Sequence, residues 1–249
     1  MIEARYAIST PDGVMPVFEA RPGEGGPFPL VVFLMDALGI REELRDMARR
    51  IAAAGYAVYL PDLFYRDGCP SFDPAPLAQG RLDPRMVALN LGLTMASTSS
   101  DCGALLAHAR ADASIRLPGA VIGFCMGGRH AISAAATHPD AFAAMASLHG
   151  GMLVNDTDAS PHRLIARMRA EAYFGWADDD PAAPPAHLRA VESALRARQL
   201  PWQVELHAGA LHGFTFPERF CHHPVAAERV WSRLFSLFER TLHGPAQPG

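Results

Sequence analysis

Short apolar runs alternate with amphipathic segments along almost the whole chain. Residues 30–35 are apolar at every position, which is typical of a strand buried on both faces of a parallel sheet. Similar runs recur downstream and predict further strands. The predicted strands are residues 15–19, 30–35, 56–60, 120–122, 143–148, 172–176 and 202–206.

The segments between these runs carry apolar residues at helical spacing. Residues 226–242, for example, place Val230, Leu234 and Phe238 on one face. The predicted helices are residues 41–54, 84–94, 99–111, 129–136, 185–199 and 226–242. Residues 66–83, rich in Pro, Gly and Asp, are expected to form a loop. This alternation predicts an α/β protein with a mostly parallel central sheet flanked by helices in three layers, and function at the carboxyl ends of the strands.

The composition limits what the protein binds. The chain has 249 residues, of which 49% are hydrophobic and 19% charged, and its formal net charge is −4. This balance argues against a nucleic-acid or acidic-membrane partner. No stretch approaches about 18 uninterrupted apolar residues, so no membrane span is expected. We expect one domain over residues 1–249, with 244–249 a frayed tail.

The N-terminus and the cysteines indicate the compartment. Residues 1–6 lack a basic segment followed by an apolar stretch, so no signal peptide is expected. Cys69, Cys102, Cys125 and Cys221 are widely spaced and form no CxxC pair, which in a chain of this length is typical of free thiols in a reducing cytosol. We expect a cytoplasmic monomer or homodimer.

One strand-to-helix junction carries candidate chemistry. Residues 123–128 read G-F-C-M-G-G, which is the nucleophile elbow G-x-S-x-G of α/β-hydrolases with cysteine at the central position. The glycines are needed because the nucleophile sits in a strained turn, where neighbouring side chains would collide with the packed strand and helix. The pattern predicts that Cys125 is a nucleophile; the other three cysteines lack such glycines.

A thiol nucleophile needs a base, and the base needs a group that orients it. In this fold they follow the nucleophile in the order acid, then histidine. The residues 178–180 after one predicted strand are all aspartate, and each is a candidate acid. His207 and His212 follow the next predicted strand, and His207, at the strand end, is expected to be structural. No cysteine or carboxylate spacing completes a metal site with these histidines, so no bound metal is expected.

These blocks resemble the dienelactone hydrolase family over roughly residues 12–242. The elbow, the segment D-P-A-A-P at 180–184 and the segment H-G-F at 212–214 match the three catalytic blocks of that family in order and spacing. The resemblance implies an α/β-hydrolase fold and hydrolysis of lactones and esters through a Cys-His-Asp triad, without metal or organic cofactor. It selects Asp180, four residues before Pro184, and His212 as the partners of Cys125.

The resemblance also implies a role for two backbone N–H groups and a second acid. The oxyanion of acyl transfer would be bound by the N–H groups of Met126, which follows the nucleophile, and of Ala37, which follows an early strand. In the family, a glutamate at this strand end interacts with the resting cysteine and is displaced when substrate binds. Asp36 stands there, one methylene shorter. It is expected either to gate the nucleophile or to be a capping or solvated loop acid.

Substrate-binding residues are harder to choose. The dienelactone enzymes of the family hold a substrate carboxylate with arginines, one of them four residues after the catalytic histidine, where this chain has Phe216. The arginines expected near the pocket rim are Arg66, Arg81, Arg85 and Arg219. The aromatic residues expected to form an apolar pocket are Phe64, Trp176, Phe214 and Phe216.

The sequence therefore predicts a hydrolase of small carboxylic esters or lactones that acts through Cys125, His212 and Asp180 and a thioester acyl-enzyme. Two alternatives stay open. The same triad could serve an acyl or thioester hydrolase of another substrate class, or the chain could be an idle member of the fold that binds a ligand in the same pocket.

Overall fold

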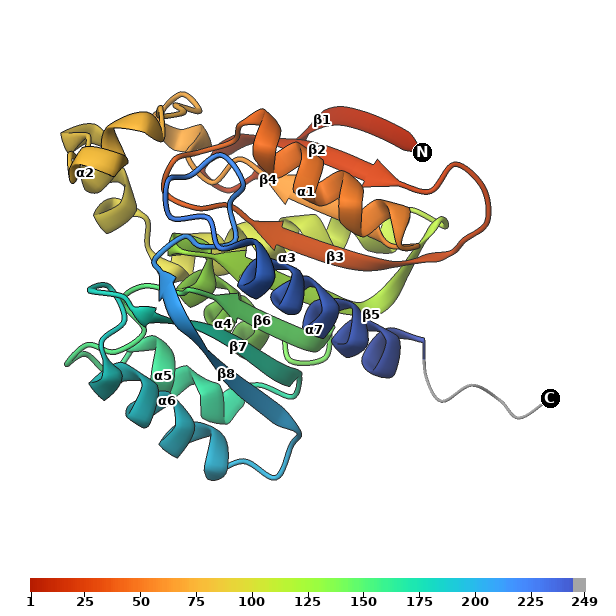
Figure 1. Cartoon of the computed structure of the whole chain (residues 1–249). Helices are drawn as coiled ribbons and strands as arrows, with labels where there is room; N and C mark the ends of the chain where they lie inside the picture. Colours follow the sequence, from red (N-terminus) through yellow and green to blue (C-terminus); the bar gives the residue numbers. More distant parts are fainter. Residues whose placement is uncertain (244–249) are drawn as a thin grey trace.

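An eight-stranded sheet forms the centre of the molecule (Figure 1). The computed structural model describes residues 1–243. The strands are β1 (Ile2–Thr10), β2 (Gly13–Arg21), β3 (Phe28–Leu34), β4 (Ala57–Pro61), β5 (Ile115–Phe124), β6 (Phe142–Leu148), β7 (Glu171–Asp179) and β8 (Trp202–Leu211). They lie in the order β1-β2-β4-β3-β5-β6-β7-β8. Strands β3 to β8 are mutually parallel, whereas β2 runs antiparallel to both of its neighbours.

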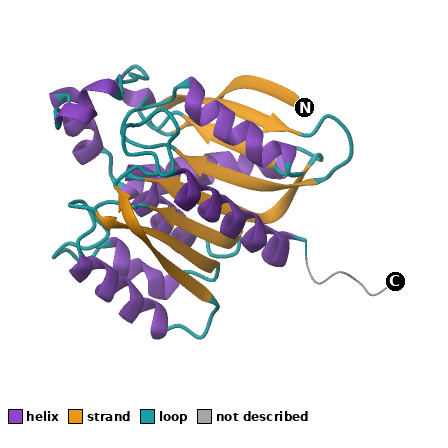
Figure 2. Cartoon of the chain, in the orientation of Figure 1, coloured by secondary structure: helices purple, strands orange, loops and turns teal. Residues whose placement is uncertain are grey.

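Helices cover both faces of this sheet. They are α1 (Glu42–Ala53), α2 (Pro84–Gly92), α3 (Met95–Ala111), α4 (Met126–Thr137), α5 (Pro161–Leu164), α6 (Pro185–Arg196) and α7 (Pro224–Leu242), with short 3-10 helices at Tyr65–Asp67, Ala75–Gln79 and Ile165–Arg167. In Figures 1 and 2, α1 and α7 lie in front of the sheet and α3 and α4 behind it, which makes three layers. None of the helices within residues 1–243 combines the length and the apolar character that crossing a membrane requires.

The apolar spacing seen in the sequence is what attaches the outer helices to the sheet. Helix α1 buries Leu44 and Ile51, and α7 buries Val230, Leu234 and Phe238. Each such side chain contributes about 1.5–3 kcal/mol when it leaves water.

The predicted mostly parallel sheet with helices on both faces is confirmed. The predicted strands and helices are all present, although β7 and β8 continue further, to Asp179 and Leu211. Strand β1 was missed, because this edge strand exposes most of its side chains and so lacks an apolar run. The short helix α5 was missed as well. The expectation of a frayed tail at 244–249 lies outside the described residues.

The strand order reverses beside β3, and this reversal decides where a site can form. Strand β3 pairs with β4 on one side and with β5 on the other. Loops that leave the carboxyl ends of β3 and β5 therefore diverge and open a crevice between them. Met35 begins the loop after β3 and Cys125 follows β5, so the candidate nucleophile and the candidate oxyanion loop meet at this crevice.

Candidate active site

Cys125 occupies a tight turn that requires glycine at nearby positions in the sequence. Its backbone has φ 53° and ψ −115°, a conformation that side-chain-bearing residues rarely adopt. A Cβ atom on Gly123 would overlap the carbonyl oxygen of Gly127, and one on Gly127 would overlap that of Leu34. Because both approaches involve backbone, which cannot easily move, glycine is required at these two positions.

Cys125, His212 and Asp180 lie in one hydrogen-bonded row. The Nδ1 atom of His212 is 2.7 Å from Oδ2 of Asp180, and its Nε2 atom is 3.0 Å from Sγ of Cys125. Asp180 comes directly after β7 and His212 directly after β8. The other oxygen of the buried Asp180 accepts the N–H of Ala182 at 2.8 Å, which fixes the carboxylate.

The electrostatics of this row favour a thiolate beside an imidazolium. Burial raises the pKa of the Cys125 thiol, but the His212 charge and hydrogen bond, together with the Arg219 charge, outweigh burial and lower that pKa. Burial lowers the pKa of His212, but the Cys125 charge and the Asp180 hydrogen bond outweigh it and raise the His212 pKa to about 10. Both shifts favour placing the proton on His212 rather than on Cys125.

The two aspartates that competed with Asp180 point elsewhere. Asp178 and Asp179 end β7 and are exposed. Oδ2 of Asp178 accepts the N–H of Gly209 at 3.1 Å, within the β8 edge of the sheet. Of the three, Asp180 is the one hydrogen-bonded to His212.

The backbone N–H groups of Met126 and Ala37 are available as donors. Both residues line the cavity that contains Cys125 and His212. Met126 is the first residue of α4, so its N–H has no partner within the helix. Within residues 1–243, no turn, loop or side-chain acceptor is bonded to the N–H of Ala37. Two unused donors beside the nucleophile are what an oxyanion site requires.

Asp36 is held by two arginines. Its carboxylate accepts hydrogen bonds from both terminal nitrogens of Arg41, at 2.8 and 3.0 Å, from Arg219, and from the N–H of Leu38 at 3.1 Å. The side chain is completely buried. Among the described residues, Cys125 Sγ is hydrogen-bonded to His212 and not to Asp36. In this geometry Asp36 fixes the loop that carries Ala37.

A cavity of about 270 Å³ opens beside Cys125 and His212. Its wall is mostly apolar, and much of it comes from α2 and the segment before it. The apolar lining residues from these two parts are Leu77, Leu82, Met86, Val87 and Leu91, and the rest of the apolar lining comes from Ala37, Leu38, Met126, Met152 and Ala182. Asn90, Arg129 and Arg219 add polar groups to the same wall.

Most residues predicted to bind substrate do not line this cavity. Arg66 is paired with Asp12 and with the buried Asp101 and lines a different hollow. Arg81 is exposed outside the cavity lining. Trp176 is buried and donates its indole N–H to the Ala183 carbonyl.

The two phenylalanines of the H-G-F segment are likewise internal. Phe214 and Phe216 are completely buried and absent from the lining, because the turn after His212 directs both rings into the core. Phe216 packs against the guanidinium of Arg219, whose carbon lies 4.1 Å from the ring centre. Arg219, one of the rim candidates, does reach the cavity.

The sequence analysis missed the charged lining residue Arg129, as it missed the apolar lining from α2 and the segment before it. Arg129 lies four residues after Cys125, hence one helical turn along α4, and this spacing was the available signal. It is 7% exposed, and its Nη2 donates to the backbone carbonyl and the side-chain oxygen of Asn90, at 2.5 and 2.8 Å. Among the described residues it has no carboxylate partner, whereas Arg219 is paired with Asp36.

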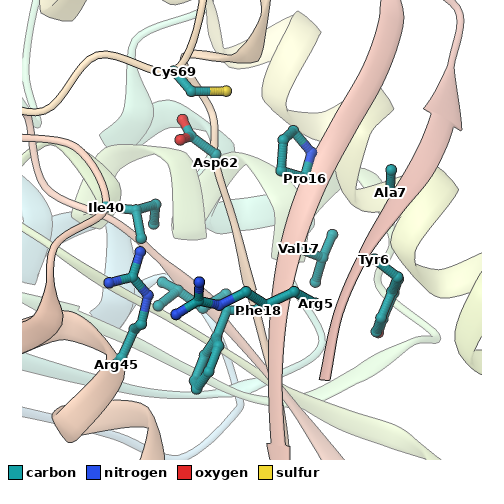
Figure 3. A pocket seen from close by; sticks show the side chains of 11 residues that line it. Arg5, Tyr6, Ala7, Pro16, Val17, Phe18, Ile40, Arg45, Asp62 and Cys69 are labelled. Atoms are coloured by element: carbon teal, nitrogen blue, oxygen red, sulfur yellow. The ribbon is translucent and has the colours of Figure 1, made fainter. Parts of the chain in front are cut away.

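A larger hollow, of about 540 Å³, lies away from the triad between β1, β2 and the loop after β4 (Figure 3). Figure 3 shows Asp62 and Cys69 at one end and Arg5 and Arg45 at the other. Burial raises the pKa of Asp62 and raises that of Cys69 to about 11, so this thiol is not activated. Across residues 1–243 no cluster of three or more His, Cys, Asp or Glu side chains is arranged to hold a metal ion.

Comparison with known proteins places this chain in a family. The chain is 30% identical over 235 residues to a protein of Escherichia coli K12 provisionally named carboxymethylenebutenolidase, which covers 91% of this chain and 82% of that one. It is 26% identical over 219 residues to the carboxymethylenebutenolidase of Rhodococcus opacus, covering 85% and 81%.

A solved structure shares the fold. The crystal structure of a provisionally named dienelactone hydrolase from Klebsiella pneumoniae superposes with a TM-score of 0.85 at 24% identity, covering 96% of this chain and 98% of that one. The profile of the dienelactone hydrolase family matches residues 15–242. With nearly the whole chain matched, the protein is a hydrolase with the α/β-hydrolase fold and belongs to the dienelactone hydrolase family.

Proposed function

We propose that this enzyme hydrolyses small carboxylic esters or lactones, with Cys125 as nucleophile, His212 as base and then acid, and Asp180 as the group that orients His212. The observation that carries the proposal is the pair of hydrogen bonds from one imidazole, 2.7 Å to Asp180 and 3.0 Å to Cys125. A thiol needs such a base, and the base needs such an orienting group.

In the first half of the reaction, the Cys125 thiolate attacks the carbonyl carbon of the ester and forms a tetrahedral intermediate. The negative charge on the former carbonyl oxygen is stabilised by the N–H groups of Met126 and Ala37. The imidazolium of His212 then gives its proton to the leaving alcohol as the carbon–oxygen bond breaks. A thioester on Cys125 remains; for a lactone, the alcohol stays attached to the acyl group.

In the second half, water replaces the alcohol. His212, now neutral, removes a proton from the water as its oxygen attacks the thioester. The tetrahedral intermediate uses the same two N–H groups, and it collapses by breaking the carbon–sulfur bond. The carboxylic acid leaves, and the thiolate–imidazolium pair is restored.

Arg129 is the residue we assign to an anionic group of the substrate. Leaving a charged group buried without a partner of opposite charge costs several kcal/mol. Burial lowers the pKa of Arg129, while a negative charge on Cys125 acts in the opposite sense. A carboxylate on the substrate would supply the missing counter-charge, and the apolar side chains of α2 would contact the rest of the molecule.

Removal of the sulfur tests the nucleophile. Cys125→Ala should lower kcat by on the order of 10³ or more for p-nitrophenyl acetate, dienelactone or a thioester, whichever the wild type hydrolyses. For an alkyl ester, whose alkoxide leaving group needs a proton, wild-type turnover should also fall above about pH 10, because His212 then loses that proton. A folded wild type with no turnover in the panel and an inert Cys125 would favour a ligand-binding protein instead.

Selective alkylation tests the electrostatics of the same residue. Iodoacetamide should label Cys125 at lower pH than the other cysteines, because its pKa is lowered whereas burial raises the pKa of Cys69, Cys102 and Cys221. Mass spectrometry after short exposures across pH 5–10 would measure each site. Preferential labelling of any other cysteine would contradict the assignment.

The choice among the aspartates is tested by substitution. Asp180→Asn should lower kcat by about 10²–10⁴, because an amide cannot orient the required His212 tautomer in the same way. Asp178→Asn and Asp179→Asn are the matched controls and should change kcat little, since both residues are exposed and neither contacts His212. A larger loss at either control would move the role of the acid to that residue.

The role of Arg129 is tested with two esters of equal chain length. For p-nitrophenyl hydrogen succinate, Arg129→Met should lower kcat/KM by about 10–100-fold, the worth of a hydrogen bond to a charged group. For p-nitrophenyl butyrate the change should be at most about threefold. Arg81→Met is the control and should leave the ratio of the two substrates unchanged. An unaltered ratio in Arg129→Met would reject the assignment and leave the triad untouched.

A further inference from the structure

His149 is a buried histidine that the reaction steps above do not use. It is the first residue after β6, at the same edge of the sheet as the triad. Its backbone has φ 37°, in the left-handed region that residues other than glycine rarely adopt. The N–H of His149 donates to the carbonyl of Gly175 at 2.7 Å, which holds the chain in this conformation.

The imidazole ring of His149 is fixed on several sides. The residue is 1% exposed, and the rings of Phe124, Phe214 and Phe216 lie around it, with centres 5.9, 5.5 and 5.3 Å away. Its Nε2 atom is hydrogen-bonded to the hydroxyl of Thr215 at 2.7 Å, and Thr215 is itself buried. The three phenylalanines hold the position of the ring, and the Thr215 bond sets its rotation.

The His149 ring also contacts the ring of His212, and this contact is the basis of the inference. The two imidazoles meet edge to face, with centres 5.4 Å apart and planes at 73°, which is a favoured geometry for aromatic pairs. Asp180 and Cys125 are hydrogen-bonded to the two ring nitrogens of His212. These two bonds alone leave the His212 ring free to rotate about the axis through its Nδ1 and Nε2 atoms. The His149 ring opposes that rotation.

His149 stays uncharged in this position. Burial lowers its pKa far below the ordinary value, and the charges of His212, Arg219 and His207 act in the same direction. A neutral ring can lie against an imidazolium without repulsion. Its Nδ1 atom is buried without a hydrogen-bond partner among the described residues, an unfavourable arrangement that a phenylalanine would avoid.

We infer that His149 is a positioning residue, whose ring, fixed by Thr215, keeps His212 aligned between Asp180 and Cys125. The inference rests on the proposed function, because it assigns His149 a role only through the triad base. The hydrogen bond to Thr215 explains why histidine stands here: a phenylalanine would fill the space but could not be fixed in rotation.

Two substitutions remove the fixed ring by different routes. His149→Phe keeps an aromatic ring but loses the bond to Thr215, and Thr215→Val keeps His149 but frees it to rotate. Each should lower kcat by about tenfold with little change in KM, the scale expected when a catalytic group is slightly misplaced. Each should also raise the pH midpoint of Cys125 alkylation by about one unit, because a tilted His212 stabilises the thiolate less.

His130 provides the matched control. It is also a completely buried histidine, with both ring nitrogens unpartnered within residues 1–243, and burial likewise lowers its pKa. It lies within α4 and has no ring contact with His212. His130→Phe should leave kcat and the alkylation midpoint unchanged, whatever it does to Tm.

The outcomes separate the two hypotheses. Wild-type kcat and midpoint in both His149→Phe and Thr215→Val would overturn the positioning role, as would equal shifts in His130→Phe. If one of the pair fails to fold, the other decides. Full turnover in Cys125→Ala would instead reject the proposed function itself, whatever the His149 variants do.

Discussion

The site depends on a steric constraint in the backbone. The turn at Cys125 brings α4 so close to β3 and β5 that the carbonyls of Leu34 and Gly127 occupy the places of two potential side chains. This close approach aims the sulfur at the crevice and leaves the N–H of Met126 free beside it. Burial of the apolar strands around the turn offsets the energetic cost of its strained backbone.

The other candidate side chains around Cys125 are positioned by the ends of separate strands. Asp180, His212 and His149 follow β7, β8 and β6, so the sheet register sets their spacing. Asp36 and its two arginines fix the loop after β3 in the same way. The two N–H groups that we propose to bind the oxyanion are thus held in place by the fold itself, so that little reorganisation would be needed when charge develops.

The sequence was sufficient where the signal is local. The elbow could be predicted because the close packing around the turn requires glycine at fixed positions on either side of the nucleophile. Strand β3 could be predicted because a strand covered on both faces is apolar throughout. The sequence was not sufficient where a side chain contacts a residue that is distant along the chain. The residues next to Arg66 in the sequence do not indicate that it pairs with Asp101. The H-G-F segment likewise does not indicate that Phe214 and Phe216 are buried in the core. The roles of Cys125, His212 and Asp180 were inferred from spacing and resemblance, and they stay predictions.

Much of the cavity wall comes from a different part of the chain than the proposed catalytic residues. The apolar side chains Leu82, Met86, Val87 and Leu91 belong to α2 and the residue segment before it, which contribute no strand to the sheet. Arg129 bonds to Asn90 and so joins this segment to the elbow helix. Substitutions in α2 can therefore reshape the cavity while the strands that position Cys125, Asp180 and His212 are left intact. Divergence of substrate range within such a scaffold requires few compensating changes, provided that the Arg129–Asn90 connection is retained.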